Sequence, residues 1–294
     1  MNAKLVDING MRKEKSILKF SKMQGTSDDY IFFNNTENII TCPESFAIEF
    51  TDRHKGIGGD GIVLIEKSDV ADAKMRIFNR DGSEGEMAGN SIRCVGKYLY
   101  DNGIVNKENI TVETASGMRS LELFTRNGKV SSVTVDMGKA YLKPAEIPAE
   151  FDGDSIIARK AHIGSKEYNI TCVSVGNPHC VIFVDNVDRV DIEKEGPQIE
   201  NADIFPERIN TEFVRVVNSR TLKMRVWERG NGETLACGTG ACAAAVAAVL
   251  EGKCAKGVDI TVKLRGGDLI VNYTDEKITL TGDCNLVFNG EIEY

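Results

Sequence analysis

The stretch WERGNGETLACGTGACA occupies residues 227–243, and a related stretch, FNRDGSEGEMAGNSIRC, occupies residues 78–94. Each reads as the end of a strand, a glycine-containing loop and the first turn of a helix. When Phe78 is placed on Trp227 and Gly89 on Gly238, the two stretches align without a gap at a separation of 149 residues, about half the chain. The pattern predicts an internal duplication that gives two similar domains facing one another.

Short runs of alternating apolar residues, bounded by Gly, Asn or Asp, recur along the rest of the chain. They lie at residues 30–34, 62–65, 74–79, 130–137, 168–175, 181–184, 213–217, 222–227, 260–264, 269–273 and 278–281. Their Val, Ile, Thr and Phe content favours strands. Helices are expected at residues 90–100, with Asn90 as N-cap, and at residues 239–251, ending at Gly252. Many strands and few long helices predict an α+β fold.

The composition is that of an ordinary globular chain of 294 residues, 41% hydrophobic and 27% charged. A net charge of −8 and a pI of about 5.2 argue against a nucleic-acid or membrane partner, because the cationic surface that such partners require is missing. The sequence shows neither a membrane-spanning run nor a signal peptide, which predicts a cytoplasmic protein. Eight cysteines without a CxxC pair, and only three histidines, predict reduced thiols and no metal site.

One of the eight cysteines stands out by its surroundings. Cys237 precedes Gly238-Thr239-Gly240 at the expected start of a helix, where exposed backbone N–H groups form an anion site. The helix field there favours a thiolate by roughly 0.3–1 kcal/mol, and by up to about 2 kcal/mol when the site is partly buried. Taken alone, Cys237 would more often be a structural residue; in this setting it is the best candidate for a reactive thiol. Two such helix ends facing each other could hold one carboxylate between them.

Five segments, in one order, resemble the diaminopimelate epimerase family. They are KMQGTSDDY (22–30), DRHKGIGGDG (52–61), SVGNPHCV (174–181) and the two stretches quoted first, and the similarity runs from about residue 17 to the C-terminus. The resemblance implies two similar domains, each a mixed or antiparallel sheet wrapped around a central helix, with the active site in the cleft between them. We expect residues 1–134 and 280–294 to form one domain and residues 135–279 the other. It also implies a homodimer that uses neither pyridoxal phosphate nor a metal.

In this family one cysteine thiolate removes the α-proton of an amino acid, and a second cysteine, as a thiol, protonates the opposite face. Inversion at a carbon requires such a group on each face. Carried over to this chain, Cys237 is one of the two thiols, and Ala88 occupies the position of the other. His179 and Glu228 match residues that influence the protonation of the thiols. The substrate-binding set is Asp28, Asn79, Gly89, Asn90, Asn177, Asn210, Glu228, Arg229, Gly238 and Thr239.

The chain departs from the family pattern at several positions. Ala88 removes a proton carrier, and Cys94, nearly two helical turns further on, is expected in the core and not as its replacement. Asp28 stands where the family usually has Asn, and Ser27 replaces a usual Gly. Residues 1–16 extend beyond the usual start of the family and are expected to form an arm or a disordered tail.

Three explanations of Ala88 stay open: a deliberate Cys→Ala replacement that traps substrate, a natural paralogue with reduced or altered activity, and a relative that only binds. The leading prediction is epimerisation of LL- to meso-2,6-diaminopimelate for lysine and peptidoglycan synthesis, impaired in this chain by Ala88. A racemase of another amino acid, such as histidine, is the first alternative, favoured if Asp28 meets a cationic side chain. A non-catalytic amino-acid-binding protein is the second.

Overall fold

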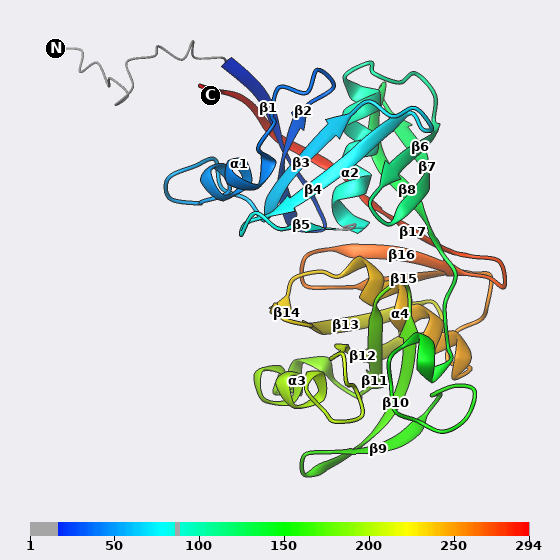
Figure 1. The fold of residues 1–294 in the computed structure, drawn as a ribbon. Helices are drawn as coiled ribbons and strands as arrows, with labels where there is room; N and C mark the ends of the chain where they lie inside the picture. Colours follow the sequence, from blue (N-terminus) through cyan, green and yellow to red (C-terminus); the bar gives the residue numbers. More distant parts are fainter. Residues whose placement is uncertain (1–16, 86–88, 294) are drawn as a thin grey trace.

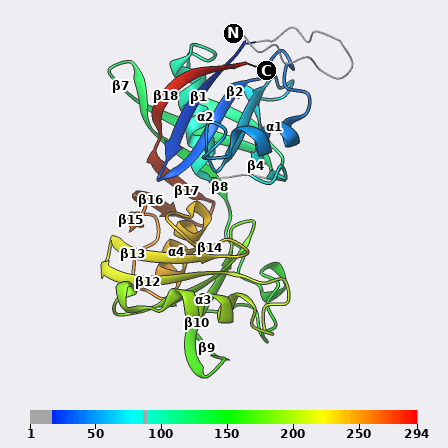
Figure 2. The same ribbon diagram turned by 90° about the vertical axis from the view of Figure 1, so that its left-hand side faces the viewer.

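The computed structural model describes residues 17–85 and 89–293, which form two lobes stacked end to end (Figures 1 and 2). The arm or tail expected at residues 1–16, and Ala88, therefore lie outside the described residues. Within the described part, no helix is both long and apolar enough to cross a membrane.

The first lobe combines the start of the chain with its end. Its elements are β1 (Ile17–Gly25), β2 (Asp28–Asn34), α1 (Pro43–Phe50), β3 (Gly61–Glu66), β4 (Ala73–Asn79), β5 (Glu84–Gly85), α2 (Gly89–Asp101), β6 (Asn109–Thr114), β7 (Gly117–Arg126), β8 (Lys129–Gly138) and β18 (Asn285–Glu293). The second lobe is formed by β9 (Arg159–Ile163), β10 (Lys166–Ser174), β11 (Pro178–Phe183), α3 (Ile192–Glu200), β12 (Asn210–Asn218), β13 (Thr221–Glu228), β14 (Gly232–Thr234), α4 (Gly238–Leu250), β15 (Asp259–Lys263) and β16 (Asp268–Tyr273). Short 3-10 helices at Pro144–Glu146 and Val187–Arg189 also belong to this lobe, and β17 (Ile278–Asp283) lies where the two lobes meet.

The two lobes repeat the same strand pattern, which confirms the predicted duplication. In the first lobe β2 pairs with β3, and β4 with β6, in parallel, whereas the other neighbouring strands pair antiparallel. The second lobe repeats this order, with parallel pairs β11–β12 and β13–β15. The helices α2 and α4 have thirteen residues each and begin 149 residues apart. The fold is therefore α+β, with two copies of one unit.

Each sheet curls around a central helix because that helix is apolar on the faces that contact the strands. The helix α4 is buried over almost its whole length, and its own side chains there are mostly alanine, valine and cysteine. The helix α2 packs Ile92, Val95 and Leu99 against the sheet of the first lobe. Both helices start within one residue of the prediction. Asn90, however, lies inside the first turn of α2 and not at an N-cap.

The strand β17 joins the two lobes. It pairs antiparallel with β16 of the second lobe and with β8 of the first, where Leu280 lies opposite Val135 and the hydroxyls of Thr281 and Thr134 are 2.6 Å apart. The predicted domain boundaries, after residues 134 and 279, fall inside these two paired strands. We keep those boundaries as a proposal.

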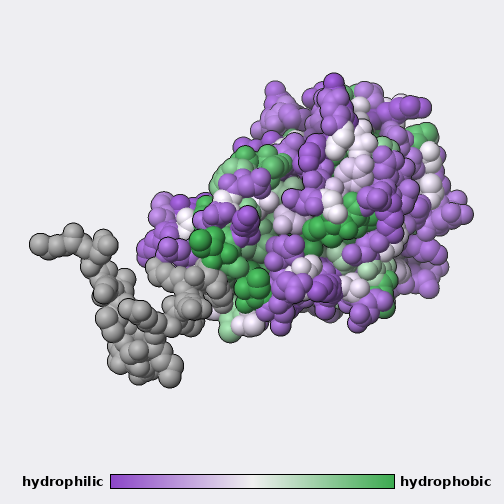
Figure 3. Space-filling model, turned by 90° about the horizontal axis from the view of Figure 1, so that it is seen from above, coloured by the Kyte–Doolittle hydropathy of each residue, from purple (hydrophilic) through white to green (hydrophobic). Residues whose placement is uncertain are grey.

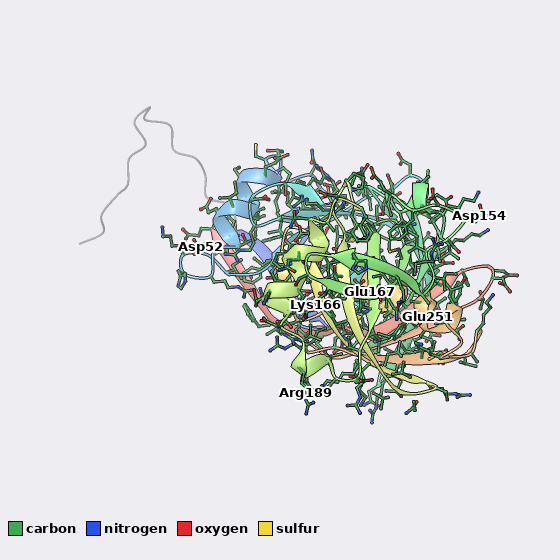
Figure 4. All side chains as sticks on the ribbon, turned by 90° about the horizontal axis from the view of Figure 1, so that it is seen from below. Asp52, Asp154, Lys166, Glu167, Arg189 and Glu251 are labelled. Carbon is green, nitrogen blue, oxygen red and sulfur yellow. The ribbon has the colours of Figure 1, made fainter. Side chains whose placement is uncertain are left out.

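The surface carries charged side chains of both signs, in agreement with the composition of 36 Lys and Arg and 44 Asp and Glu residues. The end of the molecule seen from above is mostly hydrophilic, with scattered apolar patches (Figure 3). At the opposite end, Lys166, Glu167 and Arg189 project from the second lobe (Figure 4), far from the place where the two lobes meet. Lys166 pairs there with Glu195 at 2.7 Å, so both signs of charge occupy this surface.

Candidate active site

A cavity of about 280 Å³ lies between the lobes, at the point where the N-termini of α2 and α4 face each other. Its lining comes from both repeats: Asp28, Tyr30, Gly89, Asn90, Ser116, Arg119, Val175, Gly176, Asn177, Glu228, Ala236, Cys237, Gly238 and Thr239. A second hollow of about 660 Å³ shares Asp28, Tyr30 and Glu228 with it, so the two form adjoining parts of one region.

The two helix ends approach as closely as their backbones allow. A Cβ atom added to Gly238 would lie 3.8 Å from the Cα of Gly89 and only 3.1 Å from the Cδ2 of Leu280. A side chain at residue 238 would therefore press against Leu280, which favours glycine at this approach. Because the first N–H groups of a helix have no partner within the helix, a carboxylate in the cavity would meet donors and the positive ends of two helix dipoles.

Cys237 is the N-cap of α4, and its Sγ accepts a hydrogen bond from the N–H of Gly240 at 3.4 Å. The hydroxyl of Thr239 lies 3.5 Å from the same sulfur. Burial raises the pKa of the Cys237 thiol well above its usual range, and the carboxyls of Glu228 and Glu212 raise it further. The two hydrogen bonds lower the pKa without offsetting these effects. Burial and the two carboxyls thus favour the neutral thiol of Cys237, against the thiolate that the helix N-terminus alone was expected to favour.

Asp28 enters the cavity from the first strand-to-strand turn of the other lobe. Its Oδ2 accepts a hydrogen bond of 2.6 Å from the side-chain amide of Asn90, at the start of α2. Burial raises the pKa of Asp28 to about 7, and nearby Glu228 and Asp60 add to the rise. The hydrogen bond from Asn90 opposes the rise. Asp28 can therefore hold or release a proton near neutral pH.

A buried arginine holds Asn90 in place. Arg93, with no exposed surface, donates to the Oδ1 of Asn90 at 2.9 Å and to the carbonyl of Gly89 at 3.1 Å. It also donates to the hydroxyl of Thr26 at 2.7 Å and to the carbonyl of Asp283 at 3.1 Å. The guanidinium thus ties the helix end to the turn before β2 and to the end of β17.

His179 does not line the cavity but contacts Asn177, which does. Its Nδ1 is 2.7 Å from the Oε1 of Glu212, and its Nε2 is 3.0 Å from the Oδ1 of Asn177. The amide of Asn177 in turn donates to the hydroxyl of Thr239 at 3.3 Å, which completes a chain of contacts to Cys237. Since the Asn177 oxygen only accepts, Nε2 of His179 is the donor in that contact.

Glu212 was not among the predicted site residues. It has no exposed surface, and its Oε2 has no hydrogen-bond partner within the described part of the chain. Burial raises the pKa of Glu212, whereas His179 lowers it. A glutamate in the middle of the apolar run Asn210–Asn218 was the signal that could have identified it, because such a side chain is buried only with a partner.

Four of the residues expected to bind substrate, Asn79, Asn210, Glu228 and Arg229, are only partly brought together. Glu228 lines both hollows, accepts a hydrogen bond from Thr234 and has a pKa raised by burial. Asn79 lines the larger hollow and donates to Ser83 at 3.0 Å. Asn210 and Arg229 line neither hollow.

Asn210 and Arg229 instead support the framework of the site. The side chain of Asn210 donates to the carbonyl of Pro178 at 2.9 Å and accepts from the N–H of Arg229 at 2.8 Å. The guanidinium of Arg229 donates to the carbonyl of Glu207 at 2.9 Å. The cations that line the two hollows are Arg119, Arg53 and Arg80, none of which was predicted as a site residue.

Two further observations limit the chemistry of the site. No cluster of three or more His, Cys, Asp or Glu side chains suited to a metal ion occurs within residues 17–85 and 89–293. Cys94, which was expected in the core, is buried there, and burial raises the pKa of its thiol. Cys237 is thus the cysteine that the fold brings to the cavity.

Comparison with known proteins gives one consistent family. The family model for diaminopimelate epimerase matches residues 20–143 and 171–287. The diaminopimelate epimerase of Acetivibrio thermocellus is 51% identical, with 94% of this chain and 99% of that protein covered. The enzyme of the same name from Methanococcus maripaludis is 49% identical over 94% of this chain and all of the relative.

Solved structures with low identity share the fold. A hydroxyproline epimerase from Agrobacterium vitis superimposes with a TM-score of 0.69 at 14% identity, and the match covers 96% of this chain and 93% of that one. A phenazine biosynthesis protein of the PhzF family from Bacillus anthracis gives 0.66 at 14% identity, covering 94% and 99%. On the strength of the family model and these near-full-length relatives, the chain belongs to the diaminopimelate epimerase family.

Proposed function

We propose that this chain interconverts LL- and meso-2,6-diaminopimelate, as a step in lysine and peptidoglycan precursor synthesis, and that it does so slowly. The observation that carries the proposal is the position of Cys237, at the N-terminus of α4, in a cavity closed on the other side by the N-terminus of α2. The names of the relatives supply the substrate.

The reaction begins with the α-carboxylate on the backbone N–H groups near Gly89, Asn90, Gly238 and Thr239. Donors from two helix ends stabilise the negative charge that spreads into this carboxylate when the α-proton leaves. Substrate that fills the cavity displaces water from it, which strengthens these interactions. Cys237 then serves as the proton carrier for one face of the α-carbon.

Asn177 and His179 act on that thiol through Thr239, whereas Glu228 acts on it through its charge. The chain of contacts from Glu212 through His179 and Asn177 to Thr239 fixes the hydroxyl beside the Cys237 sulfur. Glu228, in the same cavity, raises the pKa of the thiol. We therefore assign these residues to positioning and to control of the protonation of Cys237.

Ala88 deprives the opposite face of the thiol that relatives are expected to use. General acid–base groups contribute typically about 10²–10⁴-fold to a rate, and we expect a rate reduction of this order. The proposal includes a cytoplasmic homodimer, as the family resemblance implies.

Hydrogen exchange in D₂O tests the proposal. The given chain and its Ala88→Cys variant are incubated with LL-diaminopimelate, and deuterium at the α-carbon and the meso product are both measured. We expect the variant to invert the substrate at least about 100-fold faster than the given chain. An Ala88→Ser variant is the matched control, since its hydroxyl fills similar space without a thiol. Absence of inversion in the Ala88→Cys protein would contradict the epimerase assignment.

A second candidate, racemisation of a cationic amino acid such as histidine, is favoured by one observation. Two carboxyls, Asp28 and Glu228, line the same cavity, and they suit a positively charged side chain. The same exchange assay with L-histidine separates the two candidates: exchange with histidine but not with diaminopimelate would favour the second.

A further inference from the structure

The cavity receives ionisable side chains from both lobes, with Cys237 and Glu228 from the second lobe and Asp28 from the first. Within the described residues, the first lobe contributes Asp28, Tyr30, Gly89, Asn90, Ser116 and Arg119 to the lining, and Asp28 is the only carboxyl among them. Burial raises the pKa of the Tyr30 hydroxyl, and an arginine keeps its proton at neutral pH.

The internal repeat places Asp28 in a defined relation to α2. Tyr30 pairs with Gly61 on the next strand, and His179 pairs with Asn210 in the same parallel arrangement. Asp28 and Asn177, each two residues earlier, therefore occupy equivalent positions in the two lobes.

Their contacts are equivalent as well. Asn177 donates to Thr239, the second residue of α4, and Asp28 accepts from Asn90, the second residue of α2. In the second lobe, Thr239 in turn touches the sulfur of Cys237. Asp28 thus stands beside the end of α2 as Asn177 stands beside the end of α4, but it carries a group that can take up a proton.

The Asp28 carboxyl is held by one hydrogen bond and can exchange a proton near neutral pH. Asn90 binds its Oδ2, while Oδ1 accepts no hydrogen bond from the described part of the chain. Burial places its pKa near 7; the carboxyls of Glu228 and Asp60 raise this value, and Asn90 and the guanidinium of Arg93 lower it. Both protonation states are therefore accessible at neutral pH.

We propose that Asp28 is the proton carrier on the face of the substrate opposite Cys237, which gives this chain a carboxyl–thiol pair in place of two thiols. The inference rests on the proposed epimerase function. Such a pair would let a chain with Ala88 invert its substrate.

The proton transfers balance without another reactant. The Asp28 carboxylate takes the α-proton, and the electron pair of the broken C–H bond stays on the carbon. The Cys237 thiol then protonates the other face of that carbon, so its S–H bond breaks and a new C–H bond forms. The protein is left with a carboxylic acid and a thiolate. A turnover in the reverse direction, or proton exchange with water, restores the starting state.

Four proteins test the inference: the given chain, Asp28→Asn, Ala88→Cys and the double variant. Asparagine has the shape of aspartate but cannot carry the proton. We expect Asp28→Asn to lower kcat for inversion at least tenfold in the given chain, with KM changed less than about threefold. In the Ala88→Cys background, where a thiol is restored, the same substitution should lower kcat by a clearly smaller factor than it does in the given chain. Asp69→Asn, in an exposed loop, is the matched control.

The outcomes separate the two claims. Unchanged inversion in the Asp28→Asn protein, or a loss that appears only in KM, would overturn the role of Asp28. So would a given chain that inverts no faster than the Asp28→Asn, Cys237→Ala double variant. If neither protein with Ala88→Cys inverts the substrate, the proposed function itself fails and this inference falls with it. A rise of the given chain's inversion rate through about pH 7, absent in the Ala88→Cys protein, would support a carboxylate base.

Discussion

Replacing Arg93 with methionine tests how the end of α2 is held. The guanidinium is fully buried and donates four hydrogen bonds, to Asn90, Gly89, Thr26 and Asp283. Hydrogen bonds that involve a charged group contribute about 1.5–3 kcal/mol each, so the four together contribute about 6–12 kcal/mol. Burying the charge costs several kcal/mol, which methionine avoids. We expect the free energy of unfolding to fall by about 3–5 kcal/mol.

Denaturant unfolding at neutral pH measures the loss. The matched control is Arg265→Met, which removes a 55% exposed guanidinium and its 2.9 Å ion pair with Glu233; it should cost less than about 1 kcal/mol. Arg93→Lys keeps the charge but not the planar fork, and its unfolding free energy should lie between those of the given chain and Arg93→Met. A loss below about 1 kcal/mol in Arg93→Met, with an unchanged denaturant slope, would refute this account of the network.

Three further predictions concern packing, charge and reactivity. Gly61→Ala should lower the free energy of unfolding by about 1–3 kcal/mol, because its Cβ would lie 2.4 Å from the carbonyl oxygen of Phe78; Gly89→Ala, whose nearest contact is 3.6 Å away, should cost less than about 1 kcal/mol in the same assay. Asp28→Asn should leave stability unchanged below about pH 4 and raise it by up to about 4 kcal/mol above about pH 7. Burial raises the pKa of Asp28 from an ordinary 3.8 to about 7 in the native state, so the native state with aspartate loses stability as the pH rises through that window; equal pH–stability curves for the two proteins would contradict this. A thiol reagent should modify Cys42 first, because the other seven cysteines are buried, and Cys42→Ser should remove that fast phase; Cys237 should follow slowly, and bound diaminopimelate should slow it further.

Local patterns predicted the framework well. The duplication, both central helices to within one residue, and eleven strands followed from apolar periodicity and glycine placement. Seven described strands were not predicted: β1, β5, β6, β7, β9, β14 and β18. In β18, Leu286, Val287 and Phe288 are all exposed, so no buried–exposed alternation appears. Alternation marks a strand only where one face is covered.

Sequence motifs indicated several residues that line the cavity, whereas residues that are placed by long-range packing were not predicted. Cys237, Gly238 and Thr239 line the cavity as the resemblance implied. Arg93 reads as an ordinary helix surface charge until the fold buries it against the turn at Thr26. Arg229 was expected to face a ligand, but its guanidinium contacts the Glu207 carbonyl. Such long-range contacts cannot be predicted from the spacing of residues along the sequence.

The pairing of β1 with β18 has a consequence for chain connectivity. Ile17 lies opposite Glu293 in an antiparallel pair, so the two described ends of the chain are neighbours (Figure 2). A short linker could join residue 293 to residue 17, and new termini could be opened at the exposed turn of Asn127 and Gly128. Circular permutation is tolerated when the original termini are adjacent and the new termini are opened in an exposed turn. The permuted chain would still pair β8 with β17 and form the same cavity. The hydrogen bonds between these strands join the two lobes and do not depend on the position of the chain termini.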